Sequence, residues 1–340
     1  MDFRIIKKEA ILLNPLENMA RKNVACEIRV NPLTGRTSRV CHFMTMTWPR
    51  PDLAKLAAGT EAMCPFCPDK VMLVTPCFPE ELVPEKRLVA GDVVLFPNLA
   101  PYDAISAVAT LGGRHFLPIG EIEPELIAQA YGLALNFFRR LDQAGHPESV
   151  YHLINWNYMP ASGSSLIHPH LQVFATSTAP NLMREELAAS RKYRDDHGVV
   201  FWDELVKAEQ EDGRRFIGRI GRTVWLSSFA PLGVAGDVLV VVEGVRRTLD
   251  LTDQDLRDLA LGLTRTMRAY EPLGLNSFNV NFFTGDRGDD HFRFHLVFSP
   301  RTYFNLALGT PDVGALRNLY NEAICMTYPE RTAEIVRAAF

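Results

Sequence analysis

An internal duplication limits the folds that this 340-residue chain can adopt. Residues 93–145 and residues 223–274 follow the same order: a strand, an Ala-Pro turn, a second strand, a basic pair, and an amphipathic helix that ends near a glycine. Self-similarity of this kind indicates a supersecondary unit that was copied in tandem. The sequence therefore predicts a duplicated α+β unit. No linker between the copies is long or disordered enough to separate them as independent domains.

Each copy is followed by a short strand that carries histidines on one face. The first reads SSLIHPHLQVFA at 164–175, and the second reads HFRFHLVF at 291–298. Because strand side chains alternate with period two, His168, His170 and Gln172 point the same way. Pro169 cannot donate to a ladder, which places this end of the strand at a sheet edge or leaves one position unpaired. An isolated His-x-His pair is more often structural than chemical, so other features of the chain must decide its role.

The two copies differ in the residues that can carry chemistry. His115 in the first copy corresponds to Arg246 or Arg247 in the second, and no Cys-x-x-Cys precedes the second copy. The first half is therefore the better candidate for a functional site.

The motif CPFCP at 64–68 suggests a metal site. Cys64 and Cys67 can offer two thiolates to one ion, and Zn²⁺ accepts two sulfurs and two imidazoles in a tetrahedral site. His115 and His168 are the best candidates for the two imidazoles; the other candidates are His42, His146, His152 and His197. A redox cysteine pair is the alternative, but that motif usually opens a helix after a strand, and the flanking prolines favour a metal-binding loop.

Composition excludes several classes of partner. The net charge of −4 and the pI near 6.2 give no electrostatic case for nucleic acid. The longest aliphatic run, at 238–242, is too short for a membrane span, and residues 1–8 lack the apolar region of a signal peptide. We therefore expect a cytoplasmic protein with no membrane partner.

Local patterns predict the remaining elements. Residues 1–24 read as a mixed, partly helical lead-in, followed by strands at 26–30 and 37–47. The further predictions are strands at 92–96, 104–110 and 149–155, a helix ending near 142, helices at 180–194 and 200–212, a hairpin over 216–220 and 223–229, a helix starting at Thr252, and helices at 313–325 and 331–339.

Three arginines lie close together near the predicted hairpin of residues 26–47. Arg36, Arg39 and Arg50 each read, taken singly, as part of a solvated face. The alternative is a set that contacts phosphate, because the guanidinium fork matches phosphate oxygens.

Taken together, CPFCP at 64–68, His115 before a Leu-Pro helix start, Asn157, and SSLIHPHLQ at 164–172 resemble galactose-1-phosphate uridylyltransferase and its relatives in the histidine-triad superfamily. The likeness extends over nearly the whole chain. It implies an α+β fold of two tandem histidine-triad-like halves, each an antiparallel sheet with helices on one side. It divides the chain into residues 1–180, with zinc and a catalytic histidine, and residues 181–340, a degenerate copy. Because the family is commonly dimeric, the resemblance also implies a possible homodimer, and it places the protein in carbohydrate metabolism and galactose metabolism in particular.

The resemblance also implies roles for individual residues. His170 would attack the α-phosphorus of a nucleotide sugar to form a covalent nucleotidyl-histidine, with Gln172 on the phosphoryl oxygens. Zinc would be the cofactor. Its ligands would be Cys64, Cys67, His115 and His168. The nucleotide and phosphate pocket would be formed by Asn98, Asn157, Ser164 and Ser165, and Arg36 and Arg39 are added to it as phosphate ligands. Val297 stands where relatives often carry a histidine of an additional metal site, so we expect no second metal.

Four functions remain open at this point. The first is transfer of a nucleotidyl group from a nucleotide sugar to a sugar phosphate, as in hexose-1-phosphate uridylyltransferase. The second uses inorganic phosphate as acceptor, as in an ADP-sugar or dinucleoside-polyphosphate phosphorylase. The third is a histidine-triad hydrolase, which Gln172 disfavours because many hydrolytic relatives have histidine there. The fourth is a catalytically silent protein that binds nucleotide or zinc.

Overall fold

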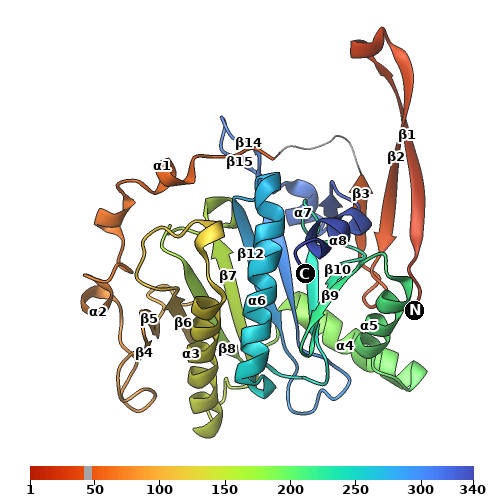
Figure 1. The fold of residues 1–340 in the computed structure, drawn as a ribbon. Helices are drawn as coiled ribbons and strands as arrows, with labels where there is room; N and C mark the ends of the chain where they lie inside the picture. The colour runs from red at the N-terminus through yellow and green to blue at the C-terminus, as the bar shows by residue number, and fades with distance from the viewer. Residues whose placement is uncertain (42–47) are drawn as a thin grey trace.

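The computed structural model describes residues 1–41 and 48–340 (Figure 1). Within these ranges, ten strands form one antiparallel sheet in the order β4-β5-β6-β8-β7-β12-β13-β11-β10-β9. The strands of the first half are β4 (Leu88–Ala90), β5 (Val93–Pro97), β6 (Ile105–Thr110), β7 (Tyr151–Tyr158) and β8 (His170–Thr176). Those of the second half are β9 (Phe216–Ile220), β10 (Thr223–Ser227), β11 (Val238–Val242), β12 (Ser277–Phe283) and β13 (His295–Arg301).

The strand order reproduces the duplication. Counted from its own edge, the first half runs β4-β5-β6-β8-β7 and the second runs β9-β10-β11-β13-β12, so corresponding strands hold corresponding places. The halves meet where β7 pairs with β12, with Asn157 opposite Asn279 and Asn155 opposite Asn281. The prediction of two tandem α+β halves is confirmed, and the halves share one continuous sheet. A division at residues 180/181 stays a prediction.

One long helix from each half covers the same face of the sheet, and the two helices lie side by side (Figure 1). α3 (Pro124–Gln143) begins with a proline, whose missing N–H is harmless in the first turn. α6 (Asp253–Tyr270) begins with a capping box between Thr252 and Asp255, as the sequence predicts. The apolar sides of both helices form the main core with the inward residues of the sheet. None of the described helices combines the length and the apolar character needed to cross a bilayer.

The opposite face of the sheet is covered at both ends. Over the second half, α4 (Asn181–His197) and α5 (Phe201–Asp212) bury residues such as Trp202 against β10 and β11. Over the first half, the segment that contains α1 (Leu53–Ala57) and α2 (Val71–Val74) packs Phe66 and Val71 against β5 and β6. Between these two apolar clusters, half-buried polar side chains of β7, β8 and β12 occupy the middle of the face.

A second sheet joins the two ends of the chain in the order β1-β2-β3-β16. β1 (Ile5–Asn14) and β2 (Ala20–Val30) form a hairpin arm that projects from the body (Figure 1), and β3 (Thr37–Cys41) pairs in parallel with β16 (Ala323–Cys325). The prediction of a partly helical lead-in over residues 1–24 is therefore wrong. Because both faces of the arm are largely exposed, its sequence lacks the two-residue alternation that marks a half-buried strand.

The histidine strands begin later than predicted. β8 starts at His170, because Pro169 has no N–H for the ladder, although its carbonyl still accepts a hydrogen bond from Leu111 N at 2.8 Å. β8 lies between β6 and β7 and not at a sheet edge, so of the two predicted consequences of Pro169 the edge position is wrong. β13 starts at His295, because residues 289–292 form a turn closed by Phe292 N and the Asp289 carbonyl.

The predicted helix at 313–325 is also mostly wrong. Only α7 (Ala315–Leu319) is helical, and Asn321 has a left-handed φ of 55°, after which the chain enters β16. The last helix is α8 (Pro329–Arg337). The remaining short elements are β14 (Tyr303–Asn305), β15 (Thr310–Pro311), and the 3₁₀ turns η1 (Pro15–Glu17), η2 (Thr60–Met63), η3 (Ile119–Glu121), η4 (Pro160–Ser162), η5 (Thr248–Asp250) and η6 (Glu271–Leu273). The predicted strand at 37–47 is described as far as Cys41; the rest of it, with His42, lies outside the described residues.

Corresponding glycines in the two long helices face different surroundings. A Cβ at Gly262 in α6 would overlap the fully buried indole of Trp225, whereas the nearest atom to a Cβ at Gly132 in α3 is Leu256 Cδ1 at 4.0 Å. We expect Gly262→Ala to lower the free energy of unfolding by about 2 kcal/mol through overpacking. Gly132→Ala should raise it by up to about 1 kcal/mol, because alanine is the better helix former. Denaturant unfolding of both variants checks this, and equal effects would contradict it.

Candidate metal centre and active site

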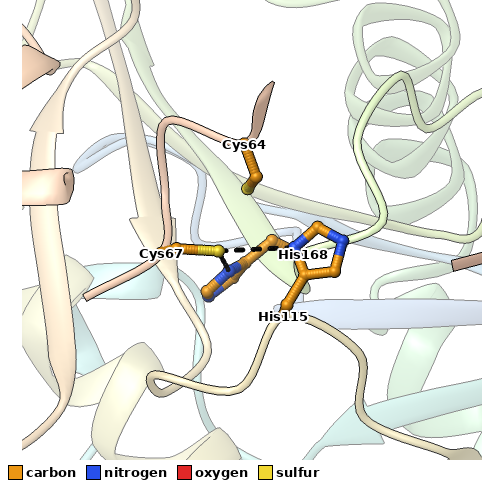
Figure 2. A group of neighbouring side chains, drawn as sticks. All are labelled: Cys64, Cys67, His115 and His168. Atoms are coloured by element: carbon orange, nitrogen blue, oxygen red, sulfur yellow. Dashed lines mark hydrogen bonds between the residues drawn. The ribbon is translucent and has the colours of Figure 1, made fainter. Parts of the chain in front are cut away.

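Two cysteines from the segment between α1 and α2 converge with two histidines. The ligand atoms of Cys64, Cys67, His115 and His168 all lie within 4.8 Å of one another, and Figure 2 shows the four side chains pointing toward a common centre. Cys67 Sγ lies 3.5 Å from Nδ1 of His115 and 3.9 Å from Nδ1 of His168. Cys64 is 1% exposed and His168 is fully buried. The structure thus assembles the four residues that the sequence proposed as metal ligands.

The local chain conformation explains this convergence. The Cys67 carbonyl accepts hydrogen bonds from the backbone N–H groups of Lys70 and Val71, which closes a tight turn after the second cysteine. Gly112, in the left-handed conformation at φ 76°, directs its carbonyl at His168. The Leu111–Pro169 hydrogen bond then holds the strand ends of β6 and β8 together, so His168 stays aligned although it lies outside β8.

Hydrogen bonds fix which nitrogen of each histidine faces the centre. His168 Nε2 lies 2.9 Å from the Gly112 carbonyl, which only accepts, so Nε2 carries the proton and Nδ1 has a free lone pair. His115 Nε2 lies 2.7 Å from Thr60 Oγ1, whose own proton goes to the Ala57 carbonyl. His115 therefore also donates from Nε2 and presents Nδ1. Such outer hydrogen bonds are typical of histidines that bind a metal.

Burial shifts the pKa values of two residues of the cluster. Burial, together with the neighbouring Cys64, raises the pKa of the Cys67 thiol to about 11. Burial lowers the pKa of His168 to about 4, so its imidazole is neutral at pH 7. A largely buried set of two sulfurs and two imidazole nitrogens is a donor set that tetrahedral Zn²⁺ accepts. These residues fit a zinc ion.

His170 lies directly beside the cluster and has a defined tautomer. Its Nδ1 lies 2.8 Å from the His168 carbonyl and must donate to it, which leaves a lone pair on Nε2. No described residue forms a hydrogen bond with Nε2. Burial lowers the pKa of His170, so the ring is neutral at pH 7. Phe66, between the two cysteines, sets its ring edge-on to His170 with centroids 5.2 Å apart.

Two rows of side chains cross the sheet next to His170. The β7–β8 register pairs Asn155 with Gln172 and Trp156 with Leu171, so Asn157 comes next to His170 at the end of the ladder. On the other side, β12 adds Asn279 beside Asn157 and Asn281 beside Asn155. Facing residues of paired strands share a face. The centre of the sheet therefore carries four asparagines, a glutamine and His170 together.

The predicted catalytic residue Gln172 and the predicted pocket residues other than the arginines fall into two groups. Asn157 and Gln172 lie on the rows just described, and Ser164 and Ser165 belong to the loop before His168, where Ser164 donates to the Leu166 carbonyl. Asn98 lies opposite Ser106, about 13 Å along the strand direction from the end that holds His170. Its carboxamide accepts from the Ala100 N–H.

The two predicted phosphate-binding arginines pair with carboxylates. Arg36 Nε lies 2.7 Å from Glu185 Oε2. Arg39, in β3 of the second sheet, has its Nε 3.1 Å from Glu322 Oε1. No hydrogen bond joins either arginine to the His170 rows within the described residues. Their role with phosphate stays a prediction, and the same holds for the role of Asn98.

Sequence reasoning missed three residues of this region: Asn155, Asn279 and Asn281. The available signal was a repeated Asn-x-Asn, at 155–157 in the first half and at 279–281 in the second. It could have been found by extending the comparison of the two copies to β7 and β12.

The second half holds a histidine at the position of His170, but in different surroundings. His295 opens β13 as His170 opens β8, and its Nδ1 lies 3.0 Å from the Arg293 carbonyl. Its ring is stacked by Trp202 at 4.0 Å and by Phe283 at 4.7 Å between centroids, and Nε2 lies 3.4 Å from Glu186. The ring lines a cavity of about 80 Å³. Nδ1 of His295 is thus hydrogen-bonded and its Nε2 lies beside a carboxylate, whereas Nε2 of His170 has no such partner within the described residues.

Comparison with solved structures identifies the fold. A GalT-like protein of Arabidopsis thaliana superimposes with a TM-score of 0.68 at 17% identity, over 91% of this chain and 98% of the other. An ADP-glucose phosphorylase of Arabidopsis thaliana with bound ADP-glucose gives 0.68 at 18% identity, over 92% and 98%. A uridylyltransferase mutant gives 0.66 at 20% identity, over 92% and 97%. The likeness identifies the fold as the tandem histidine-triad fold.

Comparison with family models finds no match. Comparison with individual proteins does find similar sequences. A protein of Archaeoglobus fulgidus named only as uncharacterized is 31% identical over 314 residues, 92% of this chain and 91% of its own. The galactose-1-phosphate uridylyltransferase of Haemophilus influenzae is 28% identical over 146 residues, which is 41% of this chain and 42% of that enzyme. Sequence similarity over part of the chain and a shared fold over nearly all of it support a place among the galactose-1-phosphate uridylyltransferase-like proteins.

The metal centre can be tested with one cysteine. We expect Cys64→Ser to lose bound zinc, measured by elemental analysis of purified protein, and to lower the thermal midpoint, because metal binding and folding are coupled. Cys77→Ser is the matched control, since Cys77 is exposed and outside the cluster. Unchanged zinc content in Cys64→Ser would remove that cysteine from the site.

Proposed function

We propose that this protein is a nucleotidyltransferase that acts on a nucleoside-diphosphate sugar through a covalent nucleotidyl-histidine at His170, in the manner of hexose-1-phosphate uridylyltransferase. In the first step, the Nε2 lone pair attacks the α-phosphorus and the bond to the bridging oxygen breaks, which releases the sugar 1-phosphate. In the second, a phosphate oxygen of another sugar phosphate attacks the same phosphorus and the P–N bond breaks.

One observation carries the proposal: the hydrogen bond from His170 Nδ1 to the His168 carbonyl. It keeps the proton on Nδ1 and directs a neutral, uncommitted Nε2 outward, which is the form of imidazole that can attack phosphorus near pH 7. The same hydrogen bond strengthens when the ring gains positive charge on bonding phosphorus. The nucleophile needs no separate base.

The cysteine–histidine cluster would serve as the rigid support of this nucleophile. Zinc held by Cys64, Cys67, His115 and His168 would supply structural rigidity there. Because the His168 carbonyl is the acceptor for His170, fixing His168 fixes the direction of Nε2. Phe66, carried between the two cysteines, packs on the same ring and limits its rotation.

Gln172 would stabilise charge on the phosphoryl oxygens. It lies two residues from His170 on the same face, and its amide has no hydrogen-bond partner among the described residues. An amide donates without a proton to lose, which favours transfer to an acceptor over activation of water. A hydrolase is the weaker candidate for this reason.

The phosphorylase alternative keeps the same covalent step with inorganic phosphate as acceptor. The fold resembles the ADP-glucose phosphorylase and the uridylyltransferase almost equally, with TM-scores of 0.68 and 0.66. The base of the donor nucleotide separates the two functions.

A homodimer and a cytoplasmic location complete the proposal. The exposed apolar residues Leu13, Leu16 and Met19 near the tip of the hairpin arm support association with a second copy.

The donor is identified by mixing the protein with UDP-glucose, ADP-glucose or a diadenosine polyphosphate without acceptor and measuring intact mass. A uridylyl adduct supports the first function and an adenylyl adduct the phosphorylase. Steady release of free nucleotide would indicate a hydrolase, and no adduct with any donor would leave a binding protein.

The nucleophile is tested by His170→Gly. We expect this variant to form no adduct while it keeps its zinc, because His170 is not a metal ligand. His197→Gly is the control, since His197 is exposed at the end of α4 and should leave adduct formation unchanged. An adduct of normal extent in His170→Gly would refute the assignment.

A further inference from the structure

A chain of hydrogen bonds from the second half ends on a pocket residue of the first half. Asp312, whose side chain is fully buried, binds Arg301 through two guanidinium nitrogens, with Nε at 2.8 Å from Oδ1. Arg301 Nη1 then donates to Asn279 Oδ1 at 2.7 Å. Asn279 Nδ2 in turn donates to Asn157 Oδ1 at 2.6 Å and to the Ser162 carbonyl at 3.0 Å.

The orientation of the Asn279 carboxamide follows from the chemistry of its neighbours. Arginine has only donors, so the atom that faces Arg301 must be the oxygen. The Ser162 carbonyl only accepts, so the atom that faces it must be the NH₂ group. Both conditions give the same orientation.

Asn279 therefore also determines the orientation of Asn157. Because Asn279 presents its NH₂ group, Asn157 must accept this hydrogen bond with its oxygen. The NH₂ group of Asn157 therefore points away from β12. That group has no hydrogen-bond partner within the described residues. Asn157 follows the last β7–β8 pair, beside His170, so its free donor lies on the row that holds the nucleophile.

We propose that Asn279, held by Arg301 and Asp312, is a positioning residue that keeps the NH₂ group of Asn157 turned toward the phosphoryl group of the donor. The inference rests on the proposed function and deepens it: the second half supplies the orientation of a donor group in the site of the first half. The substrate class that this arrangement recognises is an anionic phosphoryl group, because Asn279 and its partners fix the direction of one N–H donor of Asn157.

Asn279→Asp is the sharpest test, because it keeps the shape of the side chain and replaces its NH₂ donor by an oxygen that only accepts. Arg301 still pairs with the new carboxylate, but the other carboxylate oxygen now faces Asn157 and draws its NH₂ group away from the site. The Asn157 oxygen would then face the phosphoryl group. Loss of one such donor costs on the order of 100-fold in rate. We expect a loss of about 100-fold in the rate of adduct formation at saturating donor, and about tenfold in Asn279→Ala, where Asn157 can rotate freely.

The double variant separates positioning from a general structural effect. Asn157→Ala alone should lose about 100-fold, and adding Asn279→Asp to it should cost at most about threefold more, because residues that act through one group are not additive. Asn318→Ala, on the exposed surface of α7, is the matched control. Zinc content and thermal midpoint, measured for every variant, establish that each is folded.

The outcomes distinguish this inference from the function on which it rests. Failure of the wild-type protein to form an adduct with any donor would overturn the proposed function, and the inference with it. A wild-type adduct together with a normal rate in Asn279→Asp would overturn the inference alone. So would a further large loss from Asn279→Asp in the Asn157→Ala background, since Asn279 would then act independently of Asn157.

Discussion

The pairing of β7 with β12 is the interaction on which the rest of the structure depends. It joins the inner edges of two copies of one unit and so removes two exposed strand edges at once. It also sets the register that brings Asn157 next to Asn279. Without that register the polar rows would end at the boundary of each half. The site is thus a product of the whole sheet, although its cysteines and its free histidine come from one copy.

The two copies show how one strand start can serve different purposes. His170 and His295 both open a strand and both donate from Nδ1 to the carbonyl two residues earlier. In the first copy, Nε2 of His170 has no hydrogen-bond partner among the described residues, and the neighbouring loop carries the two cysteines. In the second, Trp202 and Phe283 enclose the ring and Glu186 lies near Nε2. The local backbone geometry is shared, and the residues packed above the ring decide whether the nitrogen is accessible.

Much of this could be predicted from the sequence, for identifiable reasons. The duplication, both long helices and the Cys-x-x-Cys pair follow from local spacing, which survives folding unchanged. The choice of His115 and His168 as their partners came from the family resemblance, since both lie far from the cysteines in sequence. The hairpin arm of residues 5–30 could not, because a strand exposed on both faces has no characteristic pattern. The single ten-stranded sheet could not be predicted either, since side-chain alternation shows which face of a strand is buried but not which strand edges pair. Asn279 escaped notice because the value of its amide depends on Arg301 and Ser162, which are brought to it only by the tertiary fold.

The continuous sheet has a consequence for how a substrate can enter. Proteins with two lobes commonly open and close about a hinge between them. Here any bending between the halves would stretch the backbone ladder of β7 and β12 and disturb the asparagines that lie across it. Access to the centre of the sheet must then depend on the loops around it, while the sheet itself stays rigid.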